Sequence, residues 1–154
     1  TRSDRDWSSD VCSSDLNLYS RYTAIKKFLE NVDPRDPSAK RVPVSLTVSE
    51  GGDKSLLKLF DAVGTASPEK ARGYIYPNRF ARAGNPAPEG SSLTVNIDGF
   101  TPGLFRVEFY ETETGKVVRR FDVRTQTNML AIPVPRFTSD CAFKVNLLTP
   151  LTKK

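Results

Sequence analysis

The residues best able to carry chemistry in this 154-residue chain are its carboxylates, because the sequence contains no histidine. Lack of histidine excludes Ser-His-Asp and Cys-His catalysis, histidine-bearing zinc sites and a histidine pH switch. A glycosidase needs only two carboxylates, about 5 to 10 Å apart in a cleft. The candidates lie in one predicted hairpin or near predicted strand ends: Glu108, Glu111, Glu113, Asp61, Asp98 and Asp140. Strand alternation puts Glu108 on the solvated face, opposite Phe105 and Phe109, so we interpret these acids as surface and turn residues and predict no catalytic residue.

Aromatic side chains offer a second kind of site. Tyr74, Tyr76 and Tyr110 are candidate carbohydrate contacts, and with Phe80 they could form a platform on which a sugar ring or a base stacks. Tyr74 and Tyr76 also fit one side of a strand that is partly buried in a core. Both interpretations of these tyrosines stay open at the level of the sequence.

The basic residues and the remaining reactive groups indicate no further site. The net charge is +5, but lysines and arginines are scattered, so we expect solubilising charge and no nucleic-acid partner. Residues 72–74, RGY, begin like an RNA-recognition signature that Ile75 and Pro77 then break. Gly-rich phosphate loops and metal-ligand spacings are missing, so we predict no metal and no cofactor, and Cys141 fits a small buried residue. No apolar run approaches the roughly 18 residues that span a bilayer, so no membrane partner is expected.

The elements that must position these residues are short strands. In residues 104–123, LFRVEFYETETGKVVRRFDV, apolar residues alternate with polar ones, and the alternation resumes after Gly115. Gly115 can adopt the positive φ that a short hairpin turn needs. Strand patterns also mark residues 42–48, 71–77, 92–98, 129–134 and 141–148, whereas residues 55–63 fit either a short helix or a strand. With turn signals roughly every eight to twelve residues, the sequence predicts a mainly β fold, an antiparallel β-sandwich of seven or eight strands preceded by one amphipathic α-helix.

The predicted helix spans residues 17–32, NLYSRYTAIKKFLENV. Asn17 fits an N-cap, and the pair Asp33-Pro34 predicts the end of the helix, because a residue before proline avoids the α region. Its apolar residues fall on one stripe at helical spacing: Leu18, Tyr22, Ile25 and Leu29, widened by Phe28 and Val32. Such a stripe needs a partner. Either the helix packs on the domain that follows, or it belonged to a preceding domain that has been cut away.

The first sixteen residues, TRSDRDWSSDVCSSDL, have the composition of a disordered polar tail. Residues 6–16, DWSSDVCSSDL, are similar over their whole length to the translation of a short-read sequencing adapter, and residues 2–5 fit the same oligonucleotide. We therefore expect residues 1–16 to be non-native and leave them out of the fold. Cys141 is then the single native cysteine, so no disulfide is predicted, and the native N-terminus is expected to be missing.

Four stretches of the chain together resemble a known family. NLYSRYTAIKKFLENVD resembles the last helix of a barrel running into a linker, and ARGYIYPNRF resembles a strand with an A-x-G-Y-aromatic pattern. FRVEFYETETGK resembles a hairpin with a T-G turn, and residues 139–145 resemble a closing D-x-A-x-K-V strand. Residues 17–148 are thus similar to the C-terminal β-sandwich appended to (β/α)8-barrel glycoside hydrolases of bacteria, including cellulase-like and β-galactosidase-like enzymes. Phe109 departs from the Trp that many relatives carry there.

This resemblance implies an accessory domain that packs on or supports a catalytic barrel. The catalytic residues of such enzymes lie on barrel strands, and a barrel needs about 250 residues, so none is carried over and the chain is not expected to be an enzyme by itself. The expected organisation is a non-native, disordered segment (1–16), a helix and linker from a truncated upstream domain (17–36), the accessory sandwich (37–150) and a tail (151–154). The implied partners are the upstream barrel and a polysaccharide, and the implied location is secreted or periplasmic. An independent carbohydrate-binding module and a structural or adhesive surface domain remain as alternatives.

Overall fold

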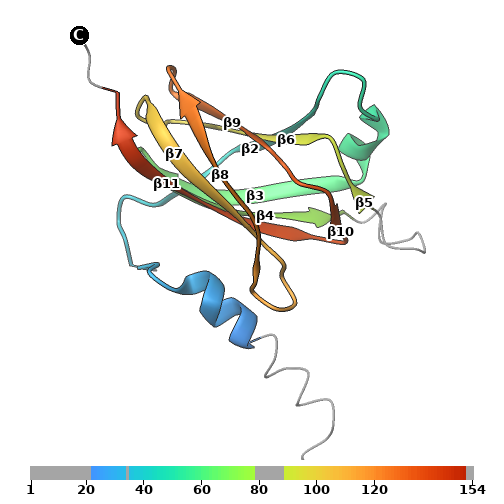
Figure 1. Ribbon diagram of the computed structural model, residues 1–154, viewed down its shortest axis with the longest axis horizontal. Coiled ribbons are helices and arrows are strands. Elements are labelled where there is room, and N and C mark those ends of the chain that lie inside the picture. Colours follow the sequence, from blue (N-terminus) through green and yellow to red (C-terminus); the bar gives the residue numbers. More distant parts are fainter. Residues whose placement is uncertain (1–21, 34, 79–88, 152–154) are drawn as a thin grey trace, which may run out of the picture.

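The structure is a computed structural model in which residues 22–33, 35–78 and 89–151 are described. These residues form an antiparallel β-sandwich with one helix outside it (Figure 1). The larger sheet has the strand order β1-β3-β4-β11-β7-β8, the smaller sheet has the order β2-β6-β9, and β10 and β5 form a third, two-stranded sheet. The prediction of a mainly β chain folded as an antiparallel sandwich behind one helix is confirmed.

Eleven strands are present in the described residues, more than the predicted seven or eight. The excess consists of β1, β5 and β10, which have only two or three residues each and so carry no periodicity that a sequence pattern can reveal. The strands are β1 (Lys40–Val42), β2 (Val44–Val48), β3 (Phe60–Ser67), β4 (Lys70–Pro77), β5 (Glu89–Gly90), β6 (Leu93–Asp98), β7 (Gly103–Tyr110), β8 (Val117–Thr125), β9 (Met129–Pro133), β10 (Phe137–Thr138) and β11 (Cys141–Pro150).

The core lies between the two larger sheets and follows the alternation of the strands. On β7, Phe105, Val107 and Phe109 are fully buried, as the hairpin pattern predicts. Cys141 at the start of β11 is buried with a free thiol, also as predicted. Each fully buried large apolar side chain contributes about 1.5 to 3 kcal/mol. The smaller sheet supplies the facing layer: Leu93, Val95, Ile97, Leu130 and Ile132.

Two paired glycines make room for this core. Gly64 on β3 lies opposite Gly73 on β4. A Cβ atom at Gly73 would lie 2.2 Å from Cζ of Phe143, and one at Gly64 would lie 2.9 Å from Cγ2 of Val44. The glycine of the A-x-G-Y stretch is therefore required by packing, because the ring of Phe143 occupies the space of its missing side chain.

Two stretches differ in detail from their predictions. Residues 42–48, predicted as one strand, belong to two sheets, since β1 joins the larger sheet and β2 the smaller one. Pro43 lies between them and cannot donate a ladder hydrogen bond, so the chain changes sheet at this residue. Residues 55–63 contain both structures that their pattern allowed: a 3-10 helix, η1 (Lys54–Lys58), followed by the start of β3.

The helix, described over residues 22–29, ends earlier than the Asp33-Pro34 signal predicts. Asn31 has a φ of 60°, and the backbone N–H of Val32 donates to the carbonyl of Leu29 at 3.0 Å. Glycine, and less often asparagine, terminates helices by adopting the left-handed conformation. Here Asn31 does so, and the helix ends before it reaches the proline. The predicted N-cap, Asn17, and the first stripe residue, Leu18, lie outside the described residues.

The helix lies against the turn of the β7–β8 hairpin (Figure 1). Ala24 is only 2% exposed, and a Cβ atom at Gly115 would lie 2.7 Å from the carbonyl oxygen of Ala24. Gly115 has the expected positive φ, 67°. The turn therefore uses glycine for its conformation and also for the close approach of the helix.

Candidate binding site

The candidate site lies on the outer face of the larger sheet, meaning the face turned away from the smaller sheet. Paired positions on successive strands place side chains in two rows across this face. The charged row consists of Arg41, Thr65, Arg72, Lys144, Glu108 and Arg120. The apolar row beside it consists of Val63, Tyr74, Ala142 and Tyr110.

Lys144, in the middle of the charged row, holds the helix on the sheet. Its Nζ atom lies 5.1 Å from the ring centroid of Phe28 and 4.9 Å from that of Tyr110, and it donates to the carbonyl oxygen of Glu30 at 3.2 Å. The two rings meet edge to face, with centroids 5.3 Å apart. Burial lowers the pKa of Lys144, against the opposing charges of Glu108 and Glu30. This residue is 7% exposed, so the helix and the outer face share one desolvated cation.

Glu108 closes the charged row with a compact ion pair. It accepts hydrogen bonds from the Tyr110 hydroxyl and from Nε of Arg120, both at 2.7 Å. Burial acts to raise the pKa of Glu108, but these two hydrogen bonds and the charge of Arg120 outweigh it and the pKa is lowered. Burial, followed by the hydrogen bond to Glu108, raises the pKa of Tyr110. Glu108 lies on the outer face as predicted, but its side chain is only 16% exposed, so its description as a solvated residue is wrong.

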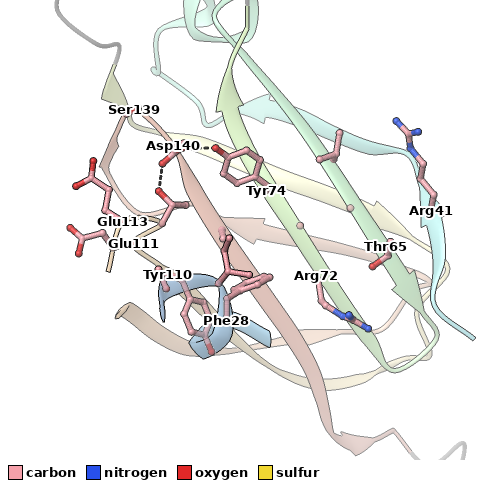
Figure 2. A pocket seen from close by; sticks show the side chains of 17 residues that line it. Phe28, Arg41, Thr65, Arg72, Tyr74, Tyr110, Glu111, Glu113, Ser139 and Asp140 are labelled. Carbon is pink, nitrogen blue, oxygen red and sulfur yellow. Dashed lines mark hydrogen bonds between the residues drawn. The ribbon is translucent and has the colours of Figure 1, made fainter. Parts of the chain in front are cut away.

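Between the helix and β3, the outer face is hollowed into a groove of about 880 Å³ (Figure 2). Ile25 and Phe28 of the helix form one wall, and the backbone of Gly64 and Gly73 lies at the floor with Ala142. Figure 2 shows the acidic residues of the groove, Glu111, Glu113 and Asp140, at one end. Arg41, Thr65 and Arg72 lie at the other end, with Tyr74 and Phe28 between them. The groove thus has an acidic end, an apolar middle and a basic end.

A hydrogen-bond network fixes the acidic end. The Tyr74 hydroxyl donates to Oδ2 of Asp140 at 2.5 Å, and the Thr112 hydroxyl donates to Oδ1 of the same carboxylate (Figure 2). This carboxylate therefore ties β4 to the hairpin turn after β7. Glu111 and Glu113 are exposed on that turn, so their carboxylates can accept hydrogen bonds from a ligand.

The three tyrosines predicted as carbohydrate contacts have different surroundings. Tyr110 is only 7% exposed, and its ring contacts Phe28 and Lys144. Tyr74 lines the groove, and Tyr76 stacks against it with ring centroids 5.5 Å apart and an interplanar angle of 16°. The structure therefore brings Tyr74 and Tyr76 together beside the groove and places Tyr110 beneath the helix.

The two arginines at the basic end are functional candidates that the scattered basic sequence does not single out. Arg41 and Arg72 are 31 positions apart, yet each is paired with Thr65, so they flank it on neighbouring strands. Only the register of β1, β3 and β4 reveals this arrangement. A sequence signal for it would have required correct pairing of a three-residue strand.

The groove has the shape of a ligand site, but its described residues offer no metal site. Within residues 22–33, 35–78 and 89–151 there is no group of three or more Cys, Asp or Glu side chains placed to hold a metal ion. Of the acids first considered, Asp98 lies on the smaller sheet, apart from the groove. No helix in the described part of the chain is long and apolar enough to cross a membrane.

No protein-family model matches the chain, and a search of curated proteins finds no significant match.

Proposed function

We propose that this chain is the non-catalytic C-terminal β-sandwich of a glycoside hydrolase and that its helix packs against the catalytic barrel of that enzyme. The observation that supports this proposal is the exposed apolar stripe of the helix. Tyr22, Ile25 and Leu29 are 67%, 53% and 44% exposed. Contiguous exposed apolar residues mark interaction sites more often than a free surface.

The helix contacts the sandwich with a different side. Ala24 and Phe28, one turn apart, face the hairpin and the outer face, and Ile25 lines the groove beside them, whereas Tyr22 and Leu29 are exposed and do not line the groove. A helix that only covered the sandwich would not need apolar residues at the positions of Tyr22 and Leu29, which form a second apolar side. The second side is explained by a second domain, which the resemblance to barrel enzymes identifies as the catalytic one.

The direct test is to amplify the source DNA across the codons for Leu16 and Asn17 without ligated adapters and to sequence it. We expect the reading frame to continue upstream of Asn17 into a few hundred residues of alternating strands and helices with paired acidic residues. The segment DWSSDVCSSDL should be missing from the native gene. A native gene that encodes this segment, or one with no barrel upstream, would favour a structural or adhesive surface domain instead.

The second candidate function is an independent carbohydrate-binding module. The groove beside Tyr74 and Tyr76 favours it, because ligand sites of this kind are concave, mostly apolar and equipped with a few polar groups. It predicts weak binding of oligosaccharides to the chain, lost on Tyr74→Ala. Unchanged binding by that variant would exclude the groove as the sugar site.

A further inference from the structure

We infer that the groove on the outer face binds an acidic oligosaccharide, with a uronate carboxylate held by Arg41 and Arg72 and sugar hydroxyls directed at the acidic end. This inference rests on the second candidate function, which it deepens by naming the ligand class. Of the exposed stripe only Ile25 lines the groove, so the contact with a barrel would use Tyr22 and Leu29.

The basic end supplies the anion-binding groups. Arg41 and Arg72 flank Thr65 across two strand spacings, so their backbones lie about 10 Å apart. Neither arginine forms an ion pair with any described residue, although three other arginines do. A guanidinium carries five donors in a planar fork that matches a carboxylate, and the Thr65 hydroxyl between them can donate as well.

The position of Arg72 carries an electrostatic cost that an anion would relieve. Arg72 lies directly opposite Lys144 on β11. Like charges on paired strand positions are destabilising, and the charges of Glu108 and Glu30 act on Lys144, whereas Arg72 interacts with the carboxylate of Asp36. A carboxylate bound between Arg41 and Arg72 would place a further negative charge at the basic end of the row.

The apolar middle fits the faces of sugar rings. Tyr74 presents its ring to the groove, held in place by Tyr76 on one side and by the hydrogen bond of its hydroxyl to Asp140. An aromatic ring fixed in this way needs no further ordering on binding, which lowers the entropic cost. Phe28 forms the opposite wall.

The acidic end favours a ligand with few negative charges and many hydroxyl groups. Glu111, Glu113 and Asp140 accept hydrogen bonds from hydroxyl groups but repel a second carboxylate nearby. A sugar with its carboxylate at the basic end can pair with the arginines there and donate hydroxyl hydrogen bonds to the acidic end. The volume of about 880 Å³ lies within the range of small-ligand pockets, about 300 to 1,000 Å³, which favours a short oligosaccharide over a protein segment.

The test is calorimetric titration of the whole 154-residue chain with a glucuronosyl-xylotriose, an oligosaccharide with a single uronate, and with its methyl ester, a matched neutral ligand. We expect the acid to bind at least about tenfold more tightly than the ester, and more weakly as salt is raised. Arg41→Ala and Arg72→Ala should each weaken binding of the acid about tenfold. Arg72→Lys should recover only part of this loss, because lysine keeps the charge and loses the fork. Arg124→Ala on β8, an exposed arginine away from the groove, should change nothing.

Each other outcome has a distinct meaning. Equal affinity for acid and ester, with loss of both on Tyr74→Ala, would overturn the acidic ligand and leave a carbohydrate-binding module. Binding of neither ligand would overturn the inference, and titration with neutral oligosaccharides would then test the second candidate function separately. An equal loss on Arg124→Ala would assign the effect to overall charge and overturn the site. Arg41 is exposed on an edge strand, so its variant keeps the test valid if Arg72→Ala fails to fold.

Discussion

Removal of the helix separates the two roles that we assign to its two sides. A chain that begins at Asp36 lacks Ala24 and Phe28, the side chains that contact the sandwich, and also the exposed stripe. The proposal predicts that this shortened chain stays folded, is moderately less stable than the whole chain and is at least as soluble. A helix that belonged to the sandwich core would give a different result, since its loss would abolish the fold.

The magnitude follows from the few contacts that the helix makes. Burial of the Ala24 methyl group contributes about 0.8 kcal/mol, and half-burial of Phe28 about 1 kcal/mol. The edge-to-face pair of Phe28 and Tyr110 adds about 0.5 to 1.5 kcal/mol, and the cation–π contact of Lys144 with Phe28 about 0.5 to 1 kcal/mol. The conformational entropy lost when the helix docks offsets part of these terms. We therefore expect a net loss of about 1 to 3 kcal/mol.

The assay is thermal unfolding followed by far-ultraviolet circular dichroism, with solubility measured on the same samples. A loss of about 1 to 3 kcal/mol corresponds to a fall in Tm of roughly 4 to 12 °C at about 4 °C per kcal/mol. The matched controls are Phe28→Ala, which should reproduce part of the fall, and Leu29→Ser on the exposed stripe, which should not lower the Tm by more than about 2 °C.

Two results would refute the reasoning. Loss of a cooperative transition in the shortened chain would show that the helix is an integral part of the sandwich. A Tm identical to that of the whole chain would show that Ala24 and Phe28 do not dock on the outer face. A destabilised Leu29→Ser chain would further indicate that the stripe is already covered, and the argument for a second domain would fail.

Three further predictions test the core, the buried tyrosine and the groove. Gly73→Ala should destabilise the chain by about 1 to 3 kcal/mol in chemical unfolding, because the new Cβ would lie 2.2 Å from the ring of Phe143; an unchanged midpoint would contradict the packing. Stability should fall as pH rises above about 10, the ordinary tyrosine value, because burial and a carboxylate partner raise the pKa of Tyr110 and the folded state keeps its proton; Tyr110→Phe should flatten this part of the pH profile, and an unaltered profile would exclude Tyr110 as its cause. Ile25→Ser should weaken binding of both the glucuronosyl-xylotriose and its methyl ester severalfold without changing the preference for the acid, whereas a changed preference would mean that Ile25 does more than form a wall of the groove.

The sandwich could be predicted because its strands carry their own signal. Phe105, Val107 and Phe109 alternate with polar residues, and Gly115 marks the turn, so the β7–β8 hairpin follows from local pattern alone. The short strands could not be found in this way. β1 has three residues and takes its place from pairing with β3 over the full segment Lys40–Val42, a contact between distant parts of the chain.

The orientation of the helix lay beyond the pattern for a different reason. Helical spacing identifies an apolar stripe, but it does not say which of two surfaces the stripe faces. The contact with the sandwich uses Ala24, whose small side chain adds little to any apolar pattern, and Phe28, which the pattern counts as an edge of the stripe. Their role depends on Gly115 and Lys144, which are far away in sequence.

The candidate site could not be predicted from the sequence either, because it depends on the register of paired strands. Arg41, Thr65 and Arg72 look like scattered polar residues until β1, β3 and β4 are aligned, after which they form one end of a groove. A shift of one residue in β4 would turn Arg72 toward the core and Gly73 outward, and Phe143 would then have no space. The buried ring that requires glycine at position 73 thus also fixes the outward direction of Arg72. Packing of the core and presentation of the proposed ligand site both depend on the register of β4. A variant that loosens the packing around Gly73 should therefore also disturb the position of Arg72.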